Sequence, residues 1–192
     1  MKLSPCIRKK EELARSRFLA LTEVHFTDEA GRERRWDAAE RVNSRGAVVI
    51  VATIEPEGKL VLVKQFRPPA GRYLVEFPAG LVDPGETAEA TAVRELWEET
   101  GYRGDIIRIH PPSYNSPGLS GETVTLVEMR IDGTMYPEPP ENHQEEMEHI
   151  ETLLVHPDEF ERLAREEEAA DVALDAKVEA FFLARQWQCN RK

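Results

Sequence analysis

Apolar and polar positions along the chain form a series of short patterns that predict strands. The clearest run, Ala47–Ala52, is apolar throughout and predicts a buried strand, and the turn signal Glu55–Gly58 separates it from a second strand. Before them, two short strands joined by the turn Asp28–Gly31 are expected to form a β-hairpin. The expected strands cover residues 18–26, 32–40, 47–52, 59–66, 74–77, 105–109, 124–131 and 150–155.

One amphipathic helix is predicted between these strands, over Ala88–Thr100. Thr87 is a suitable N-cap and Gly101 a suitable end. At about 100° per residue, the helix has an apolar side that is expected to be buried and an acidic side that faces a cleft or water. The apolar side consists of Val93, Leu96, Trp97 and Thr100, and the acidic side of Glu95, Glu98 and Glu99. Two further helices are expected at 158–168 and 174–188.

Mixed strands, one central helix and a C-terminal helical layer predict an α/β protein, an α/β/α sandwich around a mixed sheet. With 192 residues and 41% hydrophobic content, the chain can form one sizeable core. We expect a catalytic domain over residues 46–192, preceded by a small antiparallel β-hairpin region over residues 1–45 that is not stable alone. The segment Tyr136–Glu148 is rich in Pro and Glu and predicts a mobile loop.

Composition excludes several classes of protein. The N-terminal segment lacks an apolar signal region and the longest apolar run is too short to span a bilayer, so we expect a soluble, cytoplasmic protein with no membrane partner. Cys6 and Cys189 have no metal-ligand or redox spacing, which fits a reducing compartment. The net charge of −11 argues against nucleic-acid binding, and a polyphosphate substrate would need local positive charge in its site.

The acidic side of the predicted helix is the main candidate for chemistry. Like charges three and four residues apart repel, so the cluster is unfavourable unless a cation offsets it. Mg²⁺ or Mn²⁺ would do so, because both take carboxylate oxygens. Taken alone, Glu95, Glu98 and Glu99 fit a solvated acidic face equally well. Arg94, one turn before Glu98, could orient carboxylates or form an ordinary surface ion pair.

The residues around this cluster favour the metal site. Gly80, Glu86 and the segment Arg94–Tyr102 occupy fixed offsets, and the whole stretch resembles the Nudix box. That family hydrolyses a nucleoside diphosphate linked to another moiety. The resemblance implies an α/β/α fold, which agrees with the predicted elements, and a divalent metal, Mg²⁺ or Mn²⁺.

Segments outside the box are similar to the ADP-ribose pyrophosphatase branch of that family, which includes nucleotide-sugar hydrolases. They are Gln65–Pro69, Glu76–Gly80 and Ser116–Gly118, with Pro117 fifteen residues beyond Tyr102. The resemblance implies hydrolysis of ADP-ribose to AMP and ribose 5-phosphate. A broader nucleotide-sugar pyrophosphatase acting on ADP-glucose, ADP-mannose or GDP-mannose remains an alternative, and a non-hydrolytic ADP-ribose sensor is a third.

The resemblance also implies roles for individual residues. Metal ligands would be Glu95, Glu98, Glu99 and the Ala79 carbonyl, and the substrate-binding residues would be Phe18, Trp36, Arg41, Arg67, Glu76 and Pro117. Arg67 would contact the diphosphate, and Glu76 would lie near the nucleoside. Trp36 would stack on adenine from a neighbouring subunit, within a homodimer whose N-terminal strands exchange. Phe18 stands where animal enzymes have a second tryptophan.

Catalysis would then use a metal-activated water, with Glu98 and Arg94 in the catalytic set and Glu86 as a further metal candidate. The family pattern for the proton acceptor matches Glu148, at the end of the Pro/Glu-rich loop. Glu145 and Glu146 compete for this role on the same loop. His143 and His149 have no trusted metal spacing, so surface histidines are the expectation.

Overall fold

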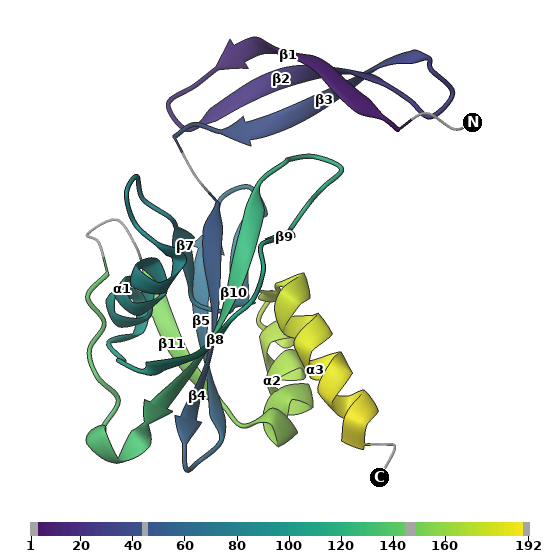
Figure 1. The fold of residues 1–192 in the computed structure, drawn as a ribbon. Coiled ribbons are helices and arrows are strands. Elements are labelled where there is room, and N and C mark those ends of the chain that lie inside the picture. The colour runs from purple at the N-terminus through teal and green to yellow at the C-terminus, as the bar shows by residue number, and fades with distance from the viewer. Residues whose placement is uncertain (1–3, 44–45, 145–148, 190–192) are drawn as a thin grey trace.

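The structure is a computed structural model that describes residues 4–43, 46–144 and 149–189. Its N-terminal part is a separate antiparallel sheet, drawn above the body of the molecule in Figure 1, with strand order β1-β2-β3. The strands are β1 (Cys6–Arg15), β2 (Leu19–Thr27) and β3 (Glu33–Arg41). The hairpin β2–β3 was predicted, but β1 was not. The sequence of β1 shows no alternation of apolar and polar residues, and every residue of the strand is exposed. Strand β1 is therefore recognised only from its pairing with β2.

A second, mixed sheet forms the centre of the body. Its main path runs β12-β6-β5-β4-β10-β8, with β11 paired to β5, β7 to β4 and β9 to β10. The strands are β4 (Ala47–Glu55), β5 (Lys59–Arg67), β6 (Arg72–Glu76), β7 (Ala79–Leu81), β8 (Asp105–Ile109), β9 (Ser113–Tyr114), β10 (Thr123–Asp132), β11 (Ile150–Val155) and β12 (Ala173–Leu174). Strand β11 was predicted as the last, which is wrong, because β12 follows α2 and pairs in parallel with β6.

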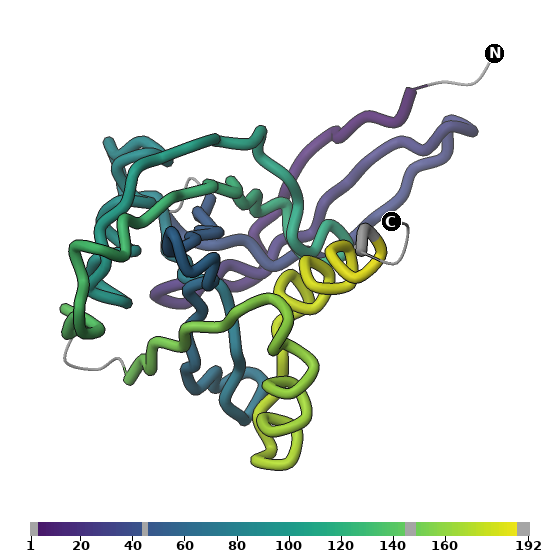
Figure 2. The backbone as a smooth tube through the Cα atoms, turned by 90° about the horizontal axis from the view of Figure 1, so that it is seen from below, coloured from purple at the N-terminus to yellow at the C-terminus, as the bar shows by residue number. Residues whose placement is uncertain are grey.

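Helices cover both faces of this sheet. Helix α1 (Ala88–Thr100) lies on one face, and α2 (Phe160–Ala169) and α3 (Ala176–Cys189) lie together on the other (Figures 1 and 2). Short 3-10 turns occur at Gly133–Met135 and Pro157–Glu159. Along β4, Val48 and Ile50 pack in the core under α1, whereas Val49 packs with α2 and α3. This alternation confirms the predicted α/β/α sandwich, since a strand buried on both faces must be apolar throughout.

Helix α1 has the predicted bounds and caps. The Thr87 side chain accepts a hydrogen bond from the Ala90 amide, and Gly101 has a φ of 75°, the left-handed conformation of a helix end. The predicted burial is partly wrong, because Val93 is 37% exposed and Glu99 only 5% exposed. Ala92, rather than Val93, packs on the sheet, and Glu99 turns inward because it accepts a backbone hydrogen bond from the neighbouring β7.

The Pro/Glu-rich segment contains no helix or strand over residues 136–144, the part that the structure describes. It is attached to α1, because the His143 amide donates to the Glu98 carbonyl at 2.7 Å. Within the described part of the chain, no helix has the length and apolar character needed to cross a membrane.

Candidate active site

A cleft of about 560 Å³ opens where α1 meets the edge formed by β4, β7 and the ends of β5 and β6. Its wall contains five carboxylates and four cations among the described residues. The carboxylates are Glu76, Asp83, Glu95, Glu98 and Glu122, and the cations are Arg41, Arg67, Arg94 and Lys177. Carboxylates therefore outnumber cations in the wall of this cleft. A bound diphosphate would add further negative charge.

Arg94 organises the carboxylates of α1. Its guanidinium binds Glu86 through two hydrogen bonds of 3.0 and 2.9 Å, and its Nη1 donates to Glu95 at 2.8 Å and Glu98 at 2.9 Å. These hydrogen bonds, chiefly those to Glu86, raise the pKa of Arg94 above its already high value. Hydrogen bonds from Arg94 and then Thr91 lower the pKa of Glu86 to about 2. The predicted orienting contact of Arg94 is present, and it extends to Glu86.

Gly80 makes room for Glu95. A Cβ added at Gly80 would lie 1.8 Å from Glu95 Oε1 and 1.9 Å from its Cδ, so any side chain there would displace the carboxylate. On the preceding residue, the Ala79 amide donates to Glu99 Oε2 at 3.1 Å. The segment Ala79–Gly80 thus lies in direct contact with two glutamates of α1, Glu95 and Glu99.

This arrangement fits a hard divalent cation. Glu95 and Glu98 line the cleft beside Ala79, and all are oxygen donors of the kind that Mg²⁺ and Mn²⁺ prefer. Glu99 is buried beside the cleft, where its Oε2 accepts a hydrogen bond from the amide of the cleft-lining Ala79. The close approach at Gly80 is explained if the Glu95 carboxylate must reach a fixed point.

Three cations of the cleft are each held by one acidic partner. Arg67 Nε donates to Glu76 at 2.6 Å, and Arg41 Nε donates to Glu122 at 2.7 Å. Lys177 Nζ donates to Asp175 at 2.8 Å. The sequence pattern identified Arg41, Arg67 and Glu76 but missed Glu122, Asp175 and Lys177. No local pattern marks these three, because they come from distant segments that only the fold brings together.

Trp36 and Pro117 line a different cavity, of about 440 Å³, between the N-terminal sheet and the loop before β10. The Trp36 indole donates to the Gly118 carbonyl of its own chain at 3.0 Å and remains 54% exposed. A third cavity, of about 330 Å³, shares Arg41 and Glu122 with the carboxylate-lined cleft at α1. It shares Glu40 with the Trp36 cavity. The three cavities are therefore neighbours with shared walls. Phe18 lines none of them and lies under the Arg17 guanidinium.

The predicted proton acceptor lies outside the described residues. Glu148 and its competitors Glu145 and Glu146 all fall in the segment 145–148. His143 stacks on Trp97 of α1, with ring centroids 4.1 Å apart. His143 is nevertheless exposed, as is His149, so the expectation of surface histidines is confirmed for both.

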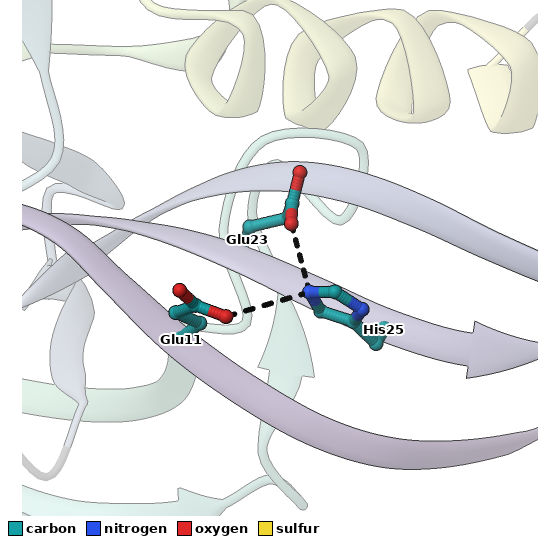
Figure 3. Close-up of side chains that lie close together, drawn as sticks. All are labelled: Glu11, Glu23 and His25. Carbon is teal, nitrogen blue, oxygen red and sulfur yellow. Dashed lines mark ion pairs between the residues drawn. The ribbon is translucent and has the colours of Figure 1, made fainter.

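A second group of potential metal ligands occurs on the N-terminal sheet. Glu11, Glu23 and His25 lie close together on β1 and β2 (Figure 3). Lys9 Nζ lies 2.7 Å from Glu11, and Arg35 Nη1 lies 3.6 Å from Glu23. Both carboxylates therefore already have cationic partners, and His25 Nε2 lies 2.7 Å from Glu23. These contacts join the three strands and need no metal.

The fold and the match to a hydrolase family place the chain among hydrolases of the α/β/α class. The NUDIX domain family model matches residues 43–176, and the chain belongs to the Nudix family. Members of this family generally require a divalent metal ion.

Several known proteins are similar to this chain over most of its length. It is 34% identical to the ADP-ribose pyrophosphatase of Saccharomyces cerevisiae, covering 94% of this chain and 84% of that one. It is 33% identical to the ADP-sugar pyrophosphatase of Mus musculus, covering 93% and 86%. A solved structure of an ADP compounds hydrolase shares the fold, with a TM-score of 0.69 and 23% identity over 100% of this chain and 97% of that one.

Proposed function

We propose that this protein hydrolyses the pyrophosphate bond of ADP-ribose, giving AMP and ribose 5-phosphate. The observation that carries the proposal is the presence of two neighbouring sites, whose cavities share lining residues with a third between them. The carboxylates arranged by Gly80 and Arg94 occupy one cleft with Arg67, and the aromatic cavity of Trp36 adjoins it. The substrates named in the yeast and mouse relatives support this assignment.

Glu95, Glu98, Glu99 and the Ala79 carbonyl would hold the metal, Mg²⁺ or Mn²⁺. When bound, such an ion lowers the pKa of water and neutralises charge on the leaving group. Arg94 keeps Glu95 and Glu98 in place, because one guanidinium binds both carboxylates. Arg67 and Arg41 each use Nε for a carboxylate, which leaves their Nη atoms for diphosphate oxygens.

We assign the proton acceptor to Glu148. It would take a proton from the attacking water. Among the described residues, Ile150 at the start of β11 pairs with Gln65 on β5, two residues before Arg67. Glu148→Gln should abolish turnover, whereas Glu146→Gln should leave it near the wild-type value. The opposite result would move the role to Glu146.

The base would lie against Trp36 of the same chain, whereas the resemblance implied Trp36 of a neighbouring subunit. An indole that is half exposed in a largely apolar cavity offers a stacking surface for adenine. Pro117 would line the base site with Trp36, whereas Phe18 lines none of the three cavities and Glu76 lies in the carboxylate-lined cleft, so neither is proposed to contact the base. We expect the affinity for AMP to fall in Trp36→Ala with little change in thermal stability.

We also propose that the active protein is a homodimer joined through its N-terminal strands. Leu19 and Leu21 point to the same face of β2 and are 49% and 45% exposed, whereas Ala20 and Thr22 on the other face are buried. A three-stranded sheet with leucines on its outer face would bury them against a second copy. This supports residues 1–45 as the dimerising region and residues 46–192 as the catalytic domain.

The deciding experiment is product analysis after incubation with ADP-ribose in water labelled with heavy oxygen. Magnesium-dependent release of labelled AMP or ribose 5-phosphate, lost with chelator, is the expected result and identifies the phosphorus attacked. Binding of ADP-ribose without AMP release would instead indicate a sensor.

A broader nucleotide-sugar pyrophosphatase is the second candidate, favoured by the name of the mouse relative. Initial rates on ADP-ribose, ADP-glucose, ADP-mannose and GDP-mannose separate the two. A rate on ADP-ribose well above the others supports the narrower activity.

A further inference from the structure

Lys177 lines the carboxylate-lined cleft but belongs to a part of the chain outside the Nudix box. It occupies the first turn of α3 and lines the cleft together with Arg67, Glu76 and Phe77. Asp175 fixes it twice, accepting from the Lys177 amide at 2.9 Å and from its Nζ at 2.8 Å. The ammonium group is therefore held at the wall of the cleft.

The start of α3 is fixed against the sheet. The Asp175 amide donates to the Val75 carbonyl on β6 at 2.9 Å, which continues the parallel pairing of β12. Next to Lys177, Val178 is fully buried, and one turn later Phe181 packs edge-on against Phe77 at 5.6 Å. A cation carried on such an anchored helix loses little freedom when it binds a ligand.

Lys177 retains capacity to bind an anion. An ammonium group has three donors, and the hydrogen bond to Asp175 uses one of them. The Lys177 side chain is 29% exposed and lines the cleft. Arg94, by contrast, is occupied by Glu86, Glu95 and Glu98.

Strand order places Lys177 at the end of the cleft away from Trp36. Glu122 immediately precedes β10, and its ion pair with Arg41 adjoins the cavity of Trp36. Lys177 follows β12, which lies beside β6 at the opposite side of β4 in the sheet. A substrate with its base on Trp36 and its diphosphate at the carboxylates would extend its other half toward Lys177.

We infer that Lys177 is a specificity-determining residue that binds the phosphate on the non-nucleotide side of the substrate. This inference rests on the proposed function. Its ligand class is a sugar phosphate, the half that leaves as ribose 5-phosphate when ADP-ribose is cleaved. Lysine suits this role because it is a compact charge that can approach a phosphate oxygen from several directions.

The test compares wild type, Lys177→Met and Lys177→Arg in steady-state hydrolysis of ADP-ribose, with AMP and ribose 5-phosphate as product inhibitors. In Lys177→Met we expect KM and the inhibition constant of ribose 5-phosphate to rise about tenfold, the loss typical of one charged hydrogen bond. The inhibition constant of AMP and kcat should change less than about threefold. Lys177→Arg should recover most of the loss, because it keeps the charge.

Lys64→Met is the matched control. Lys64 is also a partly buried lysine, paired with Glu151 at 3.1 Å and Glu167 at 3.3 Å, but it does not line the cleft. Its product inhibition should equal that of the wild type, and melting temperatures of all variants exclude misfolding. Unchanged inhibition by ribose 5-phosphate in folded Lys177→Met, or weakened inhibition by AMP instead, would overturn the inference.

Direct binding measurements distinguish a failure of the inference about Lys177 from a failure of the proposed function. If the wild type does not hydrolyse ADP-ribose, the proposed function fails, and calorimetric titration of ribose 5-phosphate into wild type and Lys177→Met tests Lys177 alone. Binding that is weaker in Lys177→Met supports the inference. Equal binding, or none by the wild type, overturns it.

Discussion

At Gly80, an added Cβ would come within 1.8 Å of the Glu95 carboxylate. At Arg94, one guanidinium binds Glu86, Glu95 and Glu98. Both residues position the Glu95 carboxylate. Gly80 leaves the space that the carboxylate occupies, and Arg94 binds it. Repulsion between neighbouring glutamates is offset locally, which leaves Glu95 and Glu98 ordered before any metal binds.

Glu95→Gln should therefore remove a proposed metal ligand without disturbing the helix. We expect turnover to fall roughly 10²–10³-fold, about 3–4 kcal/mol in the barrier, because an amide supplies less charge to a divalent ion. Glu89→Gln provides the control, since Glu89 is exposed in the first turn of the same helix and outside the cleft. Equal rates for the two variants, measured as AMP release at saturating magnesium, would argue against a metal site on this face.

At the scale of elements, the two ends of α1 are held by different means. Thr87 caps the start with its side chain, whereas Gly101 closes the end with a backbone conformation that other residues avoid. A Cβ at Gly101 would also lie 2.2 Å from the Glu141 carbonyl oxygen. The end of the helix thus meets the Pro/Glu-rich segment at a point where only glycine fits.

Gly101→Ala should lower the free energy of unfolding by about 1–3 kcal/mol, because it combines a strained φ with a backbone clash. Gly118→Ala should have a much smaller effect, since a Cβ there meets no atom within 4 Å. Urea unfolding of both variants measures the difference. Equal midpoints would show that the chain relaxes around Gly101 at no cost.

The turn between β2 and β3 makes the N-terminal sheet sensitive to acid. Asp28 accepts hydrogen bonds from the Arg32 amide, Arg34, the Arg32 side chain and the Ala30 amide, and the first of these contributes most to lowering its pKa from 3.8 to about 2. The charged form is favoured in the folded state. Its contribution to stability is therefore complete above about pH 4 and is lost as pH falls toward about 2.

Asp28→Asn should consequently lose less stability than the wild type between about pH 5 and about pH 3, because it has no carboxylate to protonate. Glu29→Gln, on the same turn, should follow the wild type, since Glu29 is exposed and forms no ion pair with the residues that the structure describes. Urea unfolding at both pH values is the measurement. An identical pH dependence in Asp28→Asn and wild type would contradict the assignment.

At the scale of the whole molecule, the body is closed on both faces by helices, but the N-terminal sheet leaves leucines exposed. Leu21→Asp should convert the proposed homodimer to a monomer, because a charge would be buried at the interface. Leu183→Asp is the control, since Leu183 is also exposed, at 57%, but lies on α3. Light scattering after size exclusion gives the mass of each, and a wild-type monomer would contradict the dimer.

Sequence by itself determined the elements whose signals are local. Helix α1 has the predicted bounds because its caps and apolar spacing lie within one segment. The turns of the hairpin and the run in β4 are equally local. The carboxylates Glu95 and Glu98 also lie on one side of α1 through helix periodicity, which is why the spacing of residues along the chain predicts a shared role for them.

Tertiary structure decided what depends on distant segments. Strands β1 and β12 exist only through pairing with β2 and β6, and no residue pattern marks either one. Glu99 turns inward because β7 presents an amide to it. Lys177 reaches the cleft because β12 and buried aromatic residues anchor α3 beside β6. Spacing along the chain encodes contacts within one helix or turn, whereas contacts between segments far apart in sequence depend on how the whole core packs.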